Sequence, residues 1–258
     1  MPNVQIGDLD IFYEKMGVGE PVIFLHSAYS RGILAFSCQL LEFQKNYTCY
    51  LPDFRGHGRT RSESLEWNTP QLAEDIISFM DTLKIAKAHF IGYSLGANVA
   101  LYCAVNHPLR MATLTTIGTS GFADPVGADE YEPEWLIEHE RFDTIEQMLE
   151  RHEQAHRGDW QAFMRQSAQD WRLYPQLSME QLKRIQCSAL FIAGEHDPFV
   201  QGEQLQLLST LVKGSRYLIV AGCSHRPHML RENPLDVNDA ILHFLQENRT
   251  FQALDSRG

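Results

Sequence analysis

The segment of the sequence most able to do chemistry is Gly92–Gly96, which reads G-Y-S-L-G and matches the pattern G-x-S-x-G. A serine hydroxyl attacks a carbonyl carbon when a nearby base removes its proton and a carboxylate orients that base. An apolar run at 89–91 precedes the motif, and a helical pattern at 97–105 follows it. A strand, a sharp turn and a helix in this order would present the Ser94 hydroxyl above a sheet. The competing interpretation is a serine that only caps the helix.

Two loops later in the sequence carry the residue types that would activate this serine. Asp197 follows an apolar run at 189–192, and His225 follows another at 217–220. Because the carboxyl ends of parallel strands meet at one edge of a sheet, we expect all three side chains to lie together. We therefore predict that Ser94 is the nucleophile, His225 the general base and Asp197 the carboxylate that orients the base.

Two other groups of histidines compete for a chemical role. His228 stands three residues beyond His225 and is the alternative base. Residues 152–156 read H-E-Q-A-H, which matches the H-E-x-x-H pattern of zinc proteases. We expect this match to be accidental and to lie on a solvated helix face, because Gly158 ends the helix and no third histidine follows at the required spacing. No metal site is predicted.

Short strand patterns alternate with helical ones over most of the chain. A helix is expected at 70–84 with Thr69 as its cap, and a hairpin at 4–6 and 11–13. This alternation predicts an α/β fold with a mostly parallel sheet flanked by helices on both faces. The remaining buried strands are predicted at 22–25, 48–51, 89–91, 112–117, 189–192 and 217–220.

The alternation stops after the sixth strand and resumes only at residue 189. We predict that residues 121–185 form an inserted helical cap, while residues 1–120 and 186–258 form the core. Aromatic side chains at helical spacing in this segment either line a substrate pocket or pack the cap, and the sequence does not separate these roles. They are Trp135, Trp160, Phe163, Trp171 and Tyr174.

The composition argues against several classes of protein. A formal net charge of −11 and the lack of a basic stripe argue against nucleic acid and anionic membranes as partners. No leader is evident and no run reaches the roughly 18 apolar residues of a membrane span, so we expect a cytoplasmic protein. The five cysteines lack CxxC spacing, which argues against a disulfide framework. We expect a small-molecule substrate and no cofactor, and the sequence leaves a homodimer open.

The order Ser, Asp, His, the G-Y-S-L-G motif and the segment 53–58, D-F-R-G-H-G, together resemble the α/β-hydrolase superfamily over about residues 11–245. The resemblance implies an α/β-hydrolase fold with an oxyanion hole. Its two donors are the backbone amides of Ala28, after the third strand, and of Leu95, after the nucleophile. Ser27 stands where the family usually has glycine, which leaves the first donor less certain than the second.

The segment 184–225 further resembles the biphenyl-hydrolase-like branch, the branch of valacyclovir hydrolase. That branch carries an acidic residue directly after the nucleophile, where this chain has Leu95. A preference for amino-acid esters is therefore not carried over.

A serine nucleophile favours one set of reactions over others. Family members that open epoxides or cleave alkyl halides use aspartate, so this resemblance implies acyl transfer. The predicted activity is hydrolysis of a carboxylic ester, lactone or thioester through an acyl-enzyme intermediate. The alternatives are a carbon-carbon bond hydrolase of a diketone or ring-cleavage product, and a non-catalytic small-molecule receptor.

Overall fold

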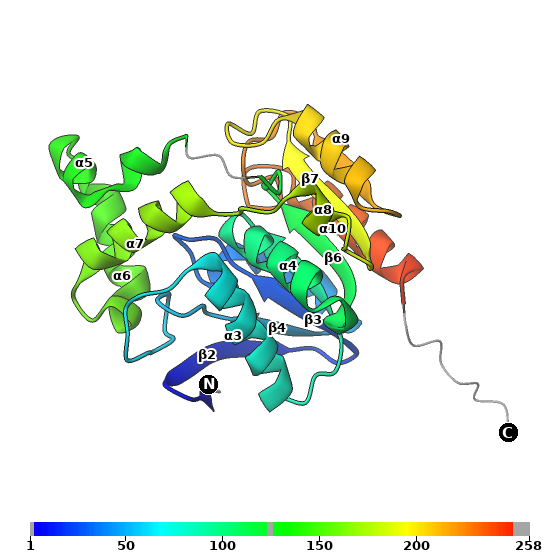
Figure 1. The fold of residues 1–258 in the computed structure, drawn as a ribbon, viewed down its shortest axis with the longest axis horizontal. Coiled ribbons are helices and arrows are strands. Elements are labelled where there is room, and N and C mark those ends of the chain that lie inside the picture. The colour runs from blue at the N-terminus through cyan, green and yellow to red at the C-terminus, as the bar shows by residue number, and fades with distance from the viewer. Residues whose placement is uncertain (1–2, 123–125, 250–258) are drawn as a thin grey trace, which may run out of the picture.

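A twisted sheet of eight strands forms the centre of the computed structural model, which describes residues 3–122 and 126–249 (Figure 1). The strands lie in the order β1-β2-β4-β3-β5-β6-β7-β8. All six predicted buried strands are present, and the predicted hairpin forms the first two strands. Their bounds are β1 Asn3–Ile6, β2 Leu9–Met16, β3 Glu20–Leu25, β4 Tyr47–Pro52, β5 Ala88–Tyr93, β6 Met111–Ile117, β7 Ser188–Gly194 and β8 Arg216–Val220.

The sheet is mostly parallel, as predicted. β1 pairs antiparallel with β2, and β2 pairs antiparallel with β4. The other neighbouring pairs are parallel. Parallel strands are buried on both faces and therefore read as continuous apolar runs, which is why β5 has no exposed residue.

Helices cover both faces of the sheet, which confirms the predicted layers. One apolar core lies beneath α3, α4 and α9, and a second lies beneath α2 and α10. Among the described residues, no helix is long and apolar enough to cross a lipid bilayer. The helices outside the β6–β7 connection are α1 Gly32–Ala35, α2 Ser37–Phe43, α3 Thr69–Thr82, α4 Leu95–Asn106, η1 Pro108–Arg110, α9 Gly202–Leu211 and α10 Pro234–Glu247.

Helix α3 occupies the predicted segment, but its cap differs from the prediction. Asn68 is the N-cap residue, and its side chain accepts a hydrogen bond from the Gln71 N–H. Thr69 instead donates both its backbone N–H and its hydroxyl to Asp170, each at 2.6 Å. The predicted Thr69 cap is therefore wrong, because a distant carboxylate claims that hydroxyl.

The described chain between β6 and β7 consists of helices joined by loops, without a strand. Figure 1 shows α5, α6 and α7 gathered beside the sheet and apart from its two helical layers. Leu136, Met148, Phe163 and Met164 form a separate apolar cluster there. The division of the chain into core and cap at residues 120 and 186 stays a prediction. The helices of this segment are η2 Ala128–Tyr131, α5 Pro133–Glu138, α6 Phe142–His156, α7 Trp160–Leu173 and α8 Met179–Leu182.

Candidate active site

Ser94 sits on the sharp turn between β5 and α4. Its φ of 54° and ψ of −117° lie in a region that residues other than glycine rarely adopt. The Ser94 N–H donates to the Ile117 carbonyl at 2.8 Å, which ties the turn to the neighbouring strand. The surrounding structure therefore holds the backbone in a strained conformation that raises the hydroxyl from the sheet edge.

Two glycines allow this turn to exist. A Cβ at Gly92 would lie 2.2 Å from the carbonyl oxygen of Gly96. A Cβ at Gly96 would lie 1.9 Å from the carbonyl oxygen of Leu25. Both distances are shorter than any real Cβ contact, so the close approach of β3, β5 and α4 excludes every other residue type at these positions.

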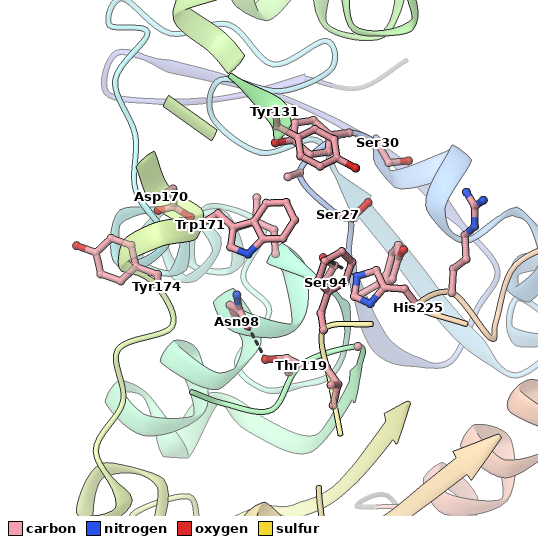
Figure 2. Close-up of a pocket in the computed structure, with 18 of the residues that line it drawn as sticks. Ser27, Ser30, Ser94, Asn98, Thr119, Tyr131, Asp170, Trp171, Tyr174 and His225 are labelled. Carbon is pink, nitrogen blue, oxygen red and sulfur yellow. Dashed lines mark hydrogen bonds between the residues drawn. The ribbon is translucent and has the colours of Figure 1, made fainter. Parts of the chain in front are cut away.

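The structure brings the three predicted side chains together in one hydrogen-bonded chain. His225 Nε2 lies 3.2 Å from Ser94 Oγ. Figure 2 shows the two side chains next to each other. His225 Nδ1 lies 2.9 Å from one carboxylate oxygen of Asp197 and 3.1 Å from the other. Asp197 is buried, which shields this contact from water. This geometry assigns Nδ1 as the donor to Asp197 and leaves Nε2 to accept the serine proton.

The loop that carries His225 is fixed by groups that sequence reasoning missed. Glu232 accepts hydrogen bonds from the N–H and the hydroxyl of Ser224, at 2.8 Å and 2.6 Å. A Cβ at Gly118 would lie 2.8 Å from His225 Cε1, and Gly118 has a φ of +69°. The glycine directly after a predicted strand was an available signal, because β6 neighbours the strand of the nucleophile.

His228, the alternative base, does not reach Ser94. It is fully buried, and its Nε2 lies 3.1 Å from the Ala35 carbonyl oxygen. Burial lowers the pKa of His228 to about 3, so the ring stays neutral. Its ring packs 4.5 Å from that of Tyr93. His228 is therefore part of the packing behind the turn, and its proposed role as base is wrong.

Ala28 and Leu95 both line the cavity that contains Ser94. Leu95 is the first residue of α4, where backbone N–H groups lack partners within the helix. Neither amide N–H donates a hydrogen bond to another of the described residues. Ser27, at the position where glycine is usual, accepts hydrogen bonds through its carbonyl from the His26 ring and the Ser30 N–H. Both amides are thus available for a developing negative charge.

The segment 53–58 supports the loop that carries Ala28. Asp53 accepts the Gly32 N–H at 3.0 Å and is paired with Arg59. The Phe54 N–H donates to His26 Nε2 at 3.0 Å. Burial lowers the pKa of His26, which keeps this nitrogen an acceptor. The D-F-R-G-H-G segment therefore holds the loop that carries Ala28 in position through hydrogen bonds on both sides of that residue.

Ser94 opens into a cavity of about 690 Å³. Trp171 and Tyr174 line it, whereas Trp135, Trp160 and Phe163 pack within the cluster of α5–α7. The two roles left open for the aromatic residues are therefore both present. Ring contacts continue along the wall from Tyr29 through Tyr131, Trp171 and Phe199 to His225, with centroids 4.6, 5.5, 5.3 and 4.9 Å apart.

Polar side chains interrupt this aromatic lining at several places. The Thr119 hydroxyl donates to Asn98 at 2.7 Å, below Ser94 in Figure 2. Asp170 is buried, and burial raises its pKa to about 6 although Thr69 donates two hydrogen bonds to it. Arg151 projects from α6 and donates to the Tyr29 carbonyl at 3.0 Å.

The H-E-Q-A-H segment is predicted to lie on a solvated helix face, and the structure shows that this prediction is wrong. His152 and His156 are 0% and 2% exposed. His152 Nδ1 accepts the Gly58 N–H at 2.9 Å, and its ring stacks on Phe163 at 4.5 Å. Within residues 3–122 and 126–249, no three side chains are grouped to hold a metal ion. His152 instead docks α6 against the segment 53–58, whereas His156 Nδ1 accepts the Gly158 N–H at 3.0 Å at the end of the same helix.

Comparison with known proteins bears on the family of this chain. The model of the Alpha/beta hydrolase family matches residues 22–240. Ethanol acetyltransferase 1 of Kluyveromyces marxianus is 31% identical over 107 residues, which cover 41% of this chain and 29% of that protein. RutD of Caulobacter vibrioides, named as a carbamate hydrolase, is 30% identical over 130 residues, 48% of each chain. The chain therefore spans half or less of the length of these curated relatives.

Solved structures add evidence on the fold alone. An esterase from Thermogutta terrifontis superposes with a TM-score of 0.79 at 20% identity. The superposition covers 97% of this chain and 100% of that chain. The order of strands and the helical segment after β6 are therefore features of a known architecture.

Proposed function

The chain belongs to the alpha/beta hydrolase family, and from this premise we propose that it is a serine hydrolase that cleaves a carboxylic ester, lactone or thioester of a small molecule. One observation carries the proposal: the continuous hydrogen-bonded chain from Ser94 through His225 to Asp197. Such a chain raises the nucleophilicity of a serine hydroxyl that is otherwise too weak an acid to react.

In the acylation half, His225 Nε2 removes the Ser94 proton as Oγ bonds to the carbonyl carbon. The carbonyl oxygen becomes an oxyanion, and the N–H groups of Ala28 and Leu95 donate to it. Asp197 stabilises the imidazolium that forms, without accepting its proton. His225 then protonates the leaving oxygen or sulfur as its bond to carbon breaks, which leaves an acyl ester on Ser94.

In the deacylation half, water takes the place of the alcohol. His225 removes a proton from water as the water oxygen attacks the acyl carbon, and the same two amides hold the second oxyanion. The proton then passes to Ser94 Oγ, and the acid leaves. Each step uses groups of this chain and needs no metal or organic cofactor.

Described residues of the segment 121–185 line the cavity, which supports the proposed role of this segment as a cap. Trp171 and Tyr174 line the same cavity as Ala28 and Leu95, and an aromatic wall favours a substrate with apolar surface. A volume of about 690 Å³ suits a small molecule and excludes a polymer chain from complete burial.

The decisive test is turnover of 4-nitrophenyl acetate by Ser94→Ala. We expect kcat to fall at least about 10⁴-fold, because no other group replaces the nucleophile. The melting temperature should stay nearly unchanged, since the substitution removes one hydroxyl and leaves the turn in place. Ser37→Ala is the matched control, because Ser37 is exposed and lies outside the cavity.

Two further measurements separate the alternatives. A fluorophosphonate probe should label wild type and fail to label Ser94→Ala. Absence of labelling in well-folded wild type would favour a small-molecule receptor. Turnover of a ring-cleavage dienoate without turnover of any ester would favour a carbon-carbon bond hydrolase.

The likeness to ethanol acetyltransferase 1 raises a second acceptor for the acyl group. An acyl-enzyme that reacts with ethanol instead of water yields an ethyl ester. Adding ethanol and measuring the ratio of ethyl ester to free acid distinguishes the two acceptors, while both outcomes require Ser94.

A further inference from the structure

Arg151 is only partly exposed, whereas Arg157 and Arg184, the other described arginines between β6 and β7 that make no ion pair, are exposed. Arg141 and Arg165 pair with nearby carboxylates at the surface, and Arg172 pairs with two. Arg151 makes no ion pair with any described residue, although it is only partly exposed. A guanidinium shielded from water without a counter-ion is destabilising, and a bound anion would relieve it.

The position of Arg151 places this charge in the candidate active site. Thr144, Gln147, Met148 and Arg151 form the stripe of α6 that lines the cavity, at the spacing of one helix face. Arg151 Nη1 donates to the carbonyl of Tyr29, the residue directly after the proposed oxyanion donor Ala28. Its remaining donors have no partner among the described residues.

The surroundings of Arg151 add positive charge. Burial lowers the pKa of Arg151, the Glu150 charge opposes this effect, and the charge of Arg31 adds to it. Arg31 Nε is itself buried and has no hydrogen-bond partner in the described part of the chain. The exposed Arg226, next to the catalytic histidine, also lines the cavity.

The cavity lining contains little negative charge. Of the described residues that line it, Asp170 alone carries a carboxylate, and both its oxygens accept hydrogen bonds from Thr69. Two arginines, Arg151 and Arg226, therefore face one lining carboxylate, which leaves an excess of positive charge on the lining of a chain whose formal net charge is −11. Such a local field selects anionic ligands over neutral ones.

We propose that the substrate carries a carboxylate in addition to its scissile ester bond, and that the Arg151 guanidinium binds this carboxylate. The inference rests on the proposed hydrolase function and adds a substrate class to it. Arginine suits this role because its planar donors match the two oxygens of a carboxylate. Arg151 is then a specificity residue on the cap side of the cavity.

The test compares esters that differ only in charge, in two series. In the first, 4-nitrophenyl hydrogen glutarate is paired with its methyl ester, so the charge lies in the acyl chain. In the second, 4-acetoxybenzoate is paired with its methyl ester, so the charge lies in the leaving group. We expect kcat/KM of the carboxylate to exceed that of its neutral partner at least about tenfold in one series.

Arg151→Gln separates recognition from a structural role. Glutamine keeps an N–H donor for the Tyr29 carbonyl but has no charge. We expect it to lower kcat/KM of the preferred carboxylate about 10- to 100-fold, mainly through KM, and to change the neutral ester less than about threefold. Arg151→Lys should restore part of the preference. Arg165→Gln, on an exposed arginine of α7, should leave both esters unchanged.

Each failure has a distinct signature. Equal losses for charged and neutral esters in Arg151→Gln would make Arg151 a structural tie and overturn the proposal. Equal turnover of both members of both series by wild type would also overturn it, while the proposed function stands. If no ester is cleaved, the proposed function falls. Calorimetric titration with glutarate then decides the inference, which requires binding to wild type and weaker binding to Arg151→Gln.

Discussion

The cavity has two walls that are built on different principles. The wall at the sheet edge is set by backbone geometry, since Gly92, Gly96 and Gly118 lie where any Cβ would collide. The helical wall from α6 and α7 is set by side-chain packing, and a Cβ at Gly158 between these helices meets nothing within 4 Å. The difference indicates that the reacting side chains need a rigid backbone to position them. Substrate selectivity can instead reside in side chains that are replaceable without changing the backbone.

The polar groups of the two walls differ in the same way. At the sheet edge, hydrogen bonds link Ser94 to His225 and His225 to Asp197, so these side chains are each other's partners. On the helical wall, Arg151 keeps donors without a partner among the described residues, and the rings of Tyr131, Trp171 and Tyr174 line the cavity beside it. The first wall is complete before a substrate arrives, and the second is completed by one.

His225→Ala, at the sheet edge, should produce the largest loss of activity. Without the base, kcat for 4-nitrophenyl acetate is expected to fall at least about 10⁴-fold with KM little changed, because the ring acts on the reacting proton. Trp171→Leu, on the helical wall, should change kcat/KM within about tenfold, since Trp171 lines the cavity but is not part of the hydrogen-bonded chain of Ser94, His225 and Asp197. Steady-state kinetics of both variants checks this prediction. Comparable losses in kcat would show that the two walls do not differ in their role in the reaction.

Gly96→Ala should produce the next largest effect, on folding. The added Cβ would lie 1.9 Å from the Leu25 carbonyl oxygen, where backbone must move on both sides. The free energy of unfolding is expected to fall by more than about 4 kcal/mol. Gly158→Ala has open space and suffers only from its φ of +93°, so a fall of about 1–2 kcal/mol is expected. Urea denaturation measures both, and similar values would show that the two walls are equally tolerant.

The sheet and the reacting residues were predictable because local signals specify them. Buried parallel strands leave apolar runs, and the carboxyl ends of such strands converge on one edge. The triad follows from that rule once Ser94 lies between a strand and a helix. His225 could not be separated from His228 by position alone, since both follow the same strand, and only burial behind Tyr93 removes His228 from the site.

The helical wall was much less predictable, because its contacts join distant parts of the chain. His152 meets Gly58 across 94 residues, and Asp170 meets Thr69 across 101. No periodicity within α6 or α3 indicates such a contact, so the sequence alone predicts solvated histidines in α6 and a capping role for Thr69. Trp171 and Phe163 likewise share one helix, yet one lines the cavity and the other packs beneath it.

Asp170 allows a smaller and sharper test of the helical wall, because its charge is buried without a cation. Burial raises its pKa from the ordinary value of 3.8 to about 6, so the native state holds this proton more tightly than the unfolded chain does. The free energy of unfolding contributed by this group is therefore highest below pH 4. It is lost as pH rises through about 6, by up to about 3 kcal/mol.

The stability of wild type relative to Asp170→Asn should accordingly fall between pH 4 and pH 7, because asparagine does not titrate. Urea denaturation of both proteins across this range measures the difference. Asp143→Asn, on the exposed surface of α6, is the control and should show a difference that varies by less than about 0.5 kcal/mol. A flat difference for Asp170→Asn would mean that water reaches the carboxylate. The helical wall would then open in solution far more than the sheet edge does.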